Sequence, residues 1–400
     1  MDKIEVRDVT KVFGKNPRRG VEMLKKGLSK SEILKKTGMT VGVSGASFSI
    51  KDGEIFVIMG LSGSGKSTLV RMLNRLIDPT AGTVLIDGED VTKMNKKQLR
   101  EMRRQKMSMV FQRFALFPHR SIVENTEYGL EIQGVSKADR RDQAMKALEL
   151  VGLSGYEEKK PTELSGGMQQ RVGLARALAG NADVLLMDEA FSALDPLIRK
   201  DMQDELVDLQ SKMKKTIVFI THDLDEALRI GDRIALMKDG VIVQVGTPEE
   251  ILMNPANDYV EQFVEDVDIT KVFTAEHVMK RPETLEASRG LRVAIKIMKD
   301  EGVATVYVTD KNKKLLGIVF ADDAAKAAEQ GKSLQDIVKP VEHVKVDTLL
   351  SDMFEAVAAS SVPIAVVDDN NRLRGIVKRS AIIDVMAGTS DILNGNGVTE

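Results

Sequence analysis

The segment GLSGSGKST, residues 60–68, constrains the fold of this chain more than any other stretch. Gly60, Gly65, Lys66 and Ser67 have the spacing G-x-x-x-x-G-K-[ST], directly after the apolar run EIFVIM and before the helical pattern STLVRMLNRL. Bare glycines let backbone N–H groups surround phosphate oxygens, while a lysine adds a positive charge and a hydroxyl adds a metal ligand. The segment therefore predicts a phosphate-binding loop between a buried strand and a helix.

Two further apolar segments, DVLLMDEA and KTIVFITHD, predict buried strands separated by helices, as in a parallel sheet covered on both faces. Asp188 and Glu189 follow one another at the end of the first of these strands. We expect Asp188 to hold Mg²⁺ together with Ser67, and Glu189 to polarise the water that attacks a phosphate. A helix-capping acidic pair is the alternative interpretation.

The segment LSGGMQQR, residues 164–171, predicts a second anion site. Ser165, Gly166 and Gly167 open a helix, and the first turn of a helix has free N–H groups that favour negative charge. An ordinary serine N-cap explains Ser165 but not the glycine pair. Because one chain carries two phosphate sites, we expect a second copy to complete each pocket head to tail.

The order of these segments, with LLMDEAFSALD and ITHD, resembles the ATPase subunit of an ABC transporter over about residues 1–265. The resemblance implies an α/β fold, a P-loop NTPase cassette with a RecA-like core and a helical subdomain at about 98–170. It implies ATP and Mg²⁺ as cofactors. The ATP-binding residues that it implies are Phe13, Gly60, Ser62, Gly63, Ser64, Gly65, Lys66, Ser67, Thr68, Gln112, Ser165, Gly166, Gly167, Gln170 and Asp195.

The same resemblance assigns individual roles. Phe13 stacks on adenine, at a position where many relatives have tyrosine. Gln112 senses Mg²⁺ and the permease. Ser67, Gln112 and Asp188 are the metal ligands that the resemblance implies. Lys66, Glu189 and His222 form the catalytic set, in which His222 contacts the γ-phosphate. Asp195 lies across the dimer. Two ATP molecules are expected between two copies, and their hydrolysis separates the copies.

A repeat begins after about Asp268: ATVYVTDKNKKLLGIVFADDA starts at residue 304, and VPIAVVDDNNRLRGIVKRSAI follows at an offset of 58 residues. Each copy predicts strand, polar turn, strand and helix, and resembles a CBS domain. We therefore expect an ATPase domain at 1–268, CBS domains at 269–332 and 333–390, and a flexible tail at 391–400.

CBS pairs form a nucleotide-binding cleft in their family, and the resemblance implies Asp323 as a ribose-binding residue in the first copy. Phe320 replaces the usual threonine, while Lys378 and Ala381 replace threonine and aspartate in the second copy. Simple AMP or ATP is therefore disfavoured. Lys378 and Arg379 suit a more anionic ligand, and cyclic-di-AMP is our hypothesis.

Residues 15–37 contain eight Lys or Arg against two Glu in a helical pattern. They are either a solvated helical insert or a basic dock for a partner or lipid headgroups. A cassette with this insert and a CBS tail resembles the glycine betaine/proline betaine importers. The segments IFVIMGLSGSGKSTLVRMLNRLI and LLMDEAFSALDPLIRKDMQDEL are similar to that group.

Composition limits the classes of function that remain. The net charge of −2 gives no general attraction to nucleic acid, and the absence of cysteine excludes disulfides and thiolate chemistry. The chain shows neither a signal peptide nor an apolar run of about 18 residues. We expect a peripheral subunit on the cytoplasmic face of the inner or plasma membrane, bound to permease subunits, that hydrolyses ATP to import an osmoprotectant. The alternatives are an importer ATPase for another solute and a soluble nucleotide-responsive regulator.

Overall fold

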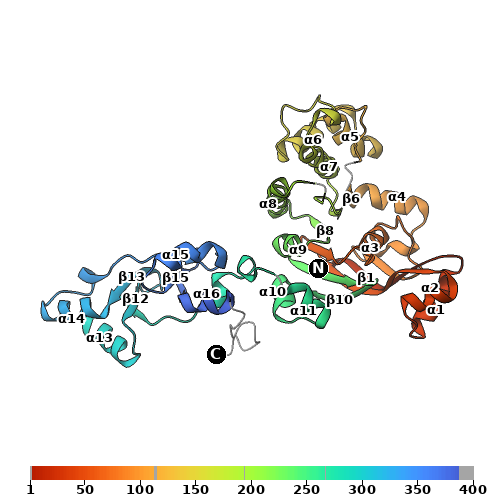
Figure 1. The fold of residues 1–400 in the computed structure, drawn as a ribbon. Helices are drawn as coiled ribbons and strands as arrows, with labels where there is room; N and C mark the ends of the chain where they lie inside the picture. The colour runs from red at the N-terminus through yellow and green to blue at the C-terminus, as the bar shows by residue number, and fades with distance from the viewer. Residues whose placement is uncertain (1, 112–114, 193, 266, 387–400) are drawn as a thin grey trace. The chain divides into compact units, whose positions relative to one another are not determined.

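The computed structural model describes residues 2–111, 115–192, 194–265 and 267–386 (Figure 1). Gln112 and the expected tail at 391–400 lie outside the described residues. The chain forms two compact units, Met1–Ile251 with Pro255–Glu265 and Leu252–Asn254 with Asp266–Glu400.

A six-stranded sheet forms the centre of the first unit. Its strand order is β10-β9-β3-β8-β7-β6, and all neighbours are parallel except β9 and β10. Every residue of β3, β7 and β8 is buried, which confirms the expected sheet covered on both faces. The strands are β3 (Ile55–Met59), β6 (Met107–Phe111), β7 (Val184–Asp188), β8 (Thr216–Thr221), β9 (Arg233–Lys238) and β10 (Val241–Gly246).

A four-stranded antiparallel sheet packs beside it in the order β2-β1-β4-β5. Its strands are β1 (Asp2–Phe13), β2 (Thr40–Lys51), β4 (Ala81–Ile86) and β5 (Glu89–Asp90). The rings of Phe48 and Phe56 stack at 5.1 Å between their centroids, and one hydrophobic core joins both sheets to α3 (Lys66–Leu73). This packing holds the phosphate loop between two sheets.

Helices fill the stretch between β6 and β7 (Figure 1). α5 (Ile122–Gln133), α6 (Lys137–Leu150) and α7 (Gly166–Ala179) pack against one another, whereas α4 (Lys96–Gln105) precedes β6. β6 lies inside the stretch expected to be mainly helical, and it pairs with β7 in the central sheet. Its five residues, MSMVF, are too short and too mixed in pattern to distinguish a strand from a helix end by sequence.

The basic insert forms two helices between β1 and β2, α1 (Pro17–Lys25) and α2 (Lys30–Thr37). This confirms its expected helical character. The other helices that begin in the first unit are α8 (Pro196–Met213), α9 (Leu224–Ile230), α10 (Pro248–Met253) and α11 (Asp258–Val264).

The second unit contains the expected repeat as two three-stranded sheets. The first has β11 (Thr284–Glu286), β12 (Thr305–Thr309) and β13 (Leu315–Phe320), and the second has β14 (His343–Lys345), β15 (Ile364–Val367) and β16 (Leu373–Val377). Their helices are α12 (Ala275–Val278), α13 (Leu291–Asp300), α14 (Ala321–Glu329), α15 (Phe354–Ala359) and α16 (Arg379–Met386).

Hydrogen bonds between the two copies have the symmetry of the repeat. The Leu315 N–H donates to the Asn371 carbonyl, and the Leu373 N–H donates to the Lys313 carbonyl. Each member of both pairs is offset by 58 residues, the offset found in the sequence. The two copies therefore face one another across an approximate twofold axis.

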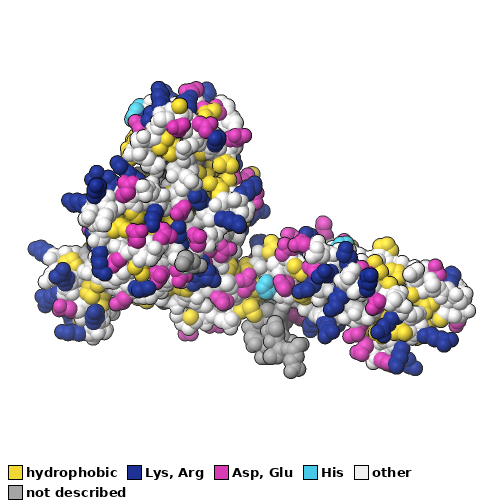
Figure 2. All heavy atoms as spheres, turned by 180° about the vertical axis from the view of Figure 1, so that it is seen from behind, with side chains coloured by type: hydrophobic (Ala, Val, Ile, Leu, Met, Phe, Trp, Pro, Cys, Tyr) yellow, Lys and Arg dark blue, Asp and Glu magenta, His cyan; other side chains and the backbone are white. Residues whose placement is uncertain are grey.

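Within the described residues, no helix is both long enough and apolar enough to cross a membrane. On the face shown in Figure 2, Lys and Arg side chains are interspersed with Asp and Glu, as the near-neutral net charge predicts.

Candidate functional site

The phosphate loop lies between β3 and the first turn of α3, in close contact with neighbouring backbone. Gly60 has a φ of 147°, and a Cβ there would lie 2.2 Å from the Met237 carbonyl oxygen. Gly65 has a φ of 107°, and a Cβ there would lie 2.3 Å from the Gly42 carbonyl oxygen. Both positions therefore require glycine, so the motif spacing reflects backbone shape as well as phosphate access.

Lys66 is 5% exposed at the first position of α3. Its Nζ donates hydrogen bonds to the carbonyl oxygens of Gly60 at 2.7 Å and Leu61 at 3.2 Å. Burial lowers the pKa of this ammonium, although the Glu189 and Asp188 carboxylates act in the opposite direction. The loop thus holds a desolvated cation, which an incoming phosphate would stabilise.

Two neighbouring strand ends bring the predicted acidic residues to the same place. Ser67 Oγ donates a hydrogen bond to Asp188 Oδ1 at 2.9 Å, and Arg71 donates to Asp188 Oδ2 at 3.3 Å. Glu189 has a φ of 47°, and its N–H donates to the Ile220 carbonyl on β8. His222 follows β8, and its Nδ1 lies 3.8 Å from Glu189 Oε1. The parallel pairing of β7 and β8 accounts for this meeting of carboxyl ends.

A cleft of about 320 Å³ lies beside the loop. Eight of the predicted site residues line it: Phe13, Ser62, Gly63, Gly65, Lys66, Ser67, Thr68 and Glu189. Phe13 is 40% exposed, and a Cβ on Gly42 would lie 2.8 Å from its ring. The absence of a side chain at Gly42 therefore makes room for an exposed ring beside the loop. Gly60 and Ser64 belong to the loop but do not line the cleft.

The residues of LSGGMQQR lie elsewhere in this chain. Ser165 caps α7, where its hydroxyl accepts from the Met168 N–H at 3.3 Å, and Gly166 and Gly167 form the first turn. Gln170 is fully buried, and neither polar atom of its amide has a hydrogen-bond partner among the described residues. Asp195 is exposed before α8. None of these residues lines the cleft.

Sequence reasoning missed four residues that line the cleft, Lys30, Thr40, Val41 and Gly42. Thr40 pairs with Phe13 and Val41 with Val12, so the return strand of the insert forms a wall of the cleft. Residues Thr40–Gly42 could have been predicted, because the strand after the insert returns beside the strand that carries Phe13. Arg71 was also missed, although it lies one helical turn after Ser67.

The oxygen atoms of Ser67 and Asp188 fit a Mg²⁺ ion shared with a nucleotide. Mg²⁺ is commonly held by one or two protein oxygens together with substrate phosphates, and the two side chains are already adjacent. In the described part of the chain no group of three or more His, Asp or Glu side chains could hold a metal by itself. Nucleotide phosphates would therefore complete the set of ligands.

The CBS residues have other contacts. Asp323 Oδ2 lies 2.7 Å from Lys339 Nζ, which also lies 5.2 Å from the centroid of the Phe320 ring. Arg379 donates to the Val357 and Ala358 carbonyl oxygens at the end of α15. Lys378 is exposed. A nucleotide that uses Asp323 would have to displace Lys339, which the sequence did not predict.

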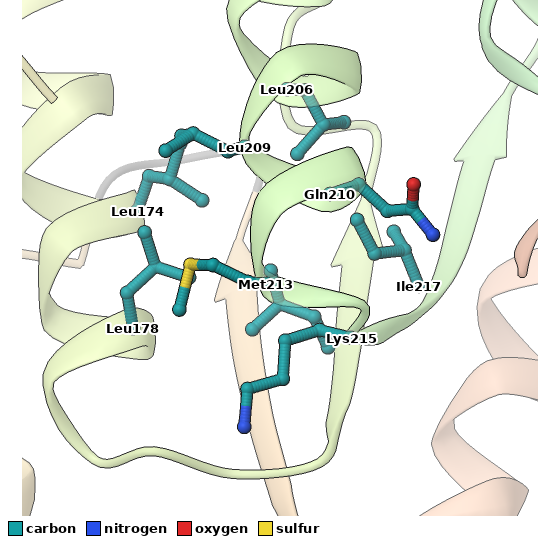
Figure 3. Close-up of a pocket in the computed structure, with 9 residues that line it drawn as sticks. Leu174, Leu178, Leu206, Leu209, Gln210, Met213, Lys215 and Ile217 are labelled. Carbon is teal, nitrogen blue, oxygen red and sulfur yellow. The ribbon is translucent and has the colours of Figure 1, made fainter. Parts of the chain in front are cut away.

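A second cavity has no functional character. It lies between α7, α8 and the sheet, and apolar side chains such as Leu174, Leu206 and Met213 surround it (Figure 3). Its volume of about 10 Å³ is close to that of a single water probe. It is a packing gap.

Comparison with known proteins identifies the family. Residues 43–192 match the ABC transporter family, and residues 275–330 and 334–388 match the CBS domain. The chain is 63% identical over 399 residues to the glycine betaine transport ATP-binding protein OpuAA of Bacillus subtilis, covering 100% of this chain and 96% of that protein. It belongs to the ATP-binding subunits of glycine betaine/proline betaine ABC importers. The expected cassette followed by two CBS domains is therefore confirmed.

Other members of this ABC family support the assignment. The glycine betaine/proline betaine transport system ATP-binding protein ProV of Escherichia coli is 51% identical over 386 residues, covering 95% of this chain and 96% of ProV. A dimeric ATP-binding cassette in a post-hydrolysis state, bound to ADP and phosphate, matches with a TM-score of 0.52 and 32% identity. It covers 61% of this chain and 98% of that cassette. Cassettes of this family bind nucleotide and dimerise.

Proposed function

We propose that two copies of this chain hydrolyse ATP to drive import of glycine betaine or a related osmoprotectant through separate permease subunits. The cluster of Ser67, Asp188, Glu189 and His222 at the edge of the cleft supports this proposal most directly. The copies act at the cytoplasmic face of the membrane, where the permease holds them. The match over the whole chain to transport proteins argues against a regulator without a transport role.

Each side chain of this cluster, together with Lys66, has a defined role in the proposed reaction. Lys66 binds the terminal phosphates, and Ser67 and Asp188 would hold Mg²⁺, which would supply positive charge to the phosphate oxygens. Glu189 accepts a hydrogen bond from the attacking water and orients it toward the γ-phosphate. His222, 3.8 Å from Glu189, contacts the same phosphate. Phosphoryl transfer depends mainly on such positioning and charge.

A second copy supplies the remaining contacts. Ser165, Gly166 and Gly167 lie outside the cleft of their own chain, yet their free N–H groups suit an anion. We place them, with Gln170 and Asp195, against the cleft of the partner. Gln112, in a segment outside the described residues, remains assigned to Mg²⁺ and the permease.

The solute and the CBS ligand are the finer parts of the proposal. OpuAA and ProV carry glycine betaine in their names, and a trimethylamine N-oxide transport protein of Pelagibacter ubique is 49% identical over 324 residues. A small amine-derived osmolyte therefore fits better than an unrelated solute. For the CBS pair, exposed Lys378 suits an anionic ligand such as cyclic-di-AMP, which would act as a brake.

The test is uptake by the chain and its permease in liposomes. We expect ATP-dependent accumulation of labelled glycine betaine, competition by related methylamines, and inhibition by cyclic-di-AMP. ATP-dependent uptake of another solute without glycine betaine uptake would overturn the solute assignment. Uptake that ignores cyclic-di-AMP at every salt concentration would overturn the brake.

A further inference from the structure

The basic insert packs on the sheet of the first unit next to the cleft. Ser29 and Glu32 form a capping box at the start of α2, and Gly38 ends it with a φ of 69°. Ile33 is fully buried against Val12, Met39 and Val41. Caps at both ends therefore fix the limits of α2, and a small hydrophobic core holds the helix on the sheet.

One basic residue of the insert differs from the others. Of the eight Lys and Arg side chains in residues 15–37, Lys30 is half-buried and the other seven are exposed. Lys30 lines the same cleft as Lys66, and no ion pair or hydrogen bond of its ammonium with another described side chain is found. A cation that lines a cleft and has no anionic partner there is available to an anionic ligand that enters the cleft.

The strands place Lys30 on the wall of the cleft that carries Phe13. Phe13 pairs with Thr40, so the insert leaves and rejoins the sheet at this point. Gly42 follows in β2, and a Cβ there would lie 3.3 Å from Thr68 Cγ2 at the end of the phosphate loop. The wall formed by the insert is thus continuous with the phosphate loop.

We propose that Lys30 is a nucleotide-binding residue and that its ammonium contacts the phosphate chain of the nucleotide from the wall of the insert. This inference rests on the proposed nucleotide site. The basic insert then has a third role besides the two that its composition suggested. Seven of its cations face solvent, while the eighth completes the cleft.

Electrostatics determines the expected size of the effect. The cleft contains the cations Lys30 and Lys66 and the carboxylate of Glu189, so a polyanionic ligand gains from each additional positive charge. Lys30 is only half-buried and is partly screened by solvent, so we expect its removal to weaken ATP binding about three- to tenfold. Lys66, which is buried, should have the larger effect.

The test measures dissociation constants of ATP and adenosine for full-length chains by titration calorimetry. The variants are Lys30→Ala, Lys30→Arg, the matched control Lys35→Ala on the exposed side of α2, and Lys66→Ala as the control for the site itself. Lys30→Ala should weaken ATP about three- to tenfold with adenosine unchanged, and its deficit should shrink as salt rises. Lys30→Arg should restore most of the affinity.

Each outcome separates the inference from its premise. Loss of ATP affinity in Lys66→Ala with none in Lys30→Ala overturns the role of Lys30 and leaves the site intact. Unchanged affinity in Lys66→Ala overturns the proposed site. Equal losses in Lys30→Ala and Lys35→Ala, or equal losses for ATP and adenosine, also contradict the phosphate contact. A melting temperature equal to that of the wild type shows that a variant is folded, and Lys30→Gln replaces Lys30→Ala if that variant fails this check.

Discussion

Glu189 adopts a backbone conformation that L residues rarely use, with a φ of 47° at the end of β7. Such strain typically costs about 1–3 kcal/mol and persists where the surrounding structure enforces it. Here the N–H of Glu189 is held by the Ile220 carbonyl, and the side chain lines the cleft. The sequence predicted the position of the acidic pair at the end of a buried strand. It did not predict this turn, because the conformation depends on the neighbouring strand.

The protonation of Lys66 predicts how ATP binding depends on pH. Burial lowers its pKa below the ordinary 10.5, so the free chain loses this charge at a lower pH than an exposed lysine would. A bound phosphate favours the ammonium, so binding takes up a proton wherever the free residue is neutral. ATP affinity should therefore fall as pH rises through the lowered pKa of the free chain.

Affinity measured from neutral to alkaline pH in wild type and Lys66→Gln checks this expectation. The variant should bind ATP roughly tenfold or more weakly at neutral pH, because it lacks a charge-assisted contact of about 1.5–3 kcal/mol. Its affinity should also lack the alkaline fall that belongs to Lys66. Parallel pH profiles for the two proteins would show that another group controls binding.

Among the helices, α7 begins with a serine to which we assign two roles: Ser165 caps the helix, and it binds nucleotide in the partner chain. Ser165 caps its own helix but does not line the cleft of its own chain. We predict that it acts in trans. A mixed dimer with Ser165→Arg in one chain and Lys66→Ala in the other should keep one intact site, because both changes fall in the same composite pocket.

The matched control places the same two substitutions in one chain instead of in two. A chain that carries both Ser165→Arg and Lys66→Ala, paired with a wild-type chain, should have no intact site. The measurement is the stoichiometry of ATP trapped by each purified dimer, one in the first case and none in the second. The reverse pattern would mean that each site belongs to a single chain.

The elements also show which contacts were predictable. The phosphate loop follows from its glycine spacing, and the repeat follows from its offset of 58 residues, since both patterns are local or periodic. Lys30 lines the cleft from a helix that packs on the sheet through Ile33, and Asp323 meets Lys339 across 16 residues of chain. Such contacts depend on tertiary packing, which a single sequence does not display.

For the whole molecule, we assign hydrolysis and regulation to different units. All described residues with a proposed hydrolytic role lie in the first unit, and the second contains the CBS pair. A chain that ends near Asp268 should therefore retain Mg²⁺-dependent ATP hydrolysis. With the permease in liposomes, it should import solute but lose inhibition by cyclic-di-AMP.

Comparison of the full-length and truncated chains over a salt series separates two kinds of control. Ionic contacts of exposed side chains weaken as the Debye length falls from about 10 Å at 0.1 M salt. A salt response that survives truncation belongs to the first unit or the membrane surface. Intact inhibition by the nucleotide after truncation would place its site outside the CBS pair.

In the proposed cycle, hydrolysis of ATP by a water that Glu189 orients drives import. ATP turnover and glycine betaine uptake, measured in the same liposomes for wild type and Glu189→Gln, test this coupling. The amide keeps the size of the side chain but lacks the charge that polarises water. We predict that the variant binds ATP and forms a stable dimer, yet neither turns over ATP nor accumulates solute. Wild-type turnover and uptake in Glu189→Gln would contradict the account.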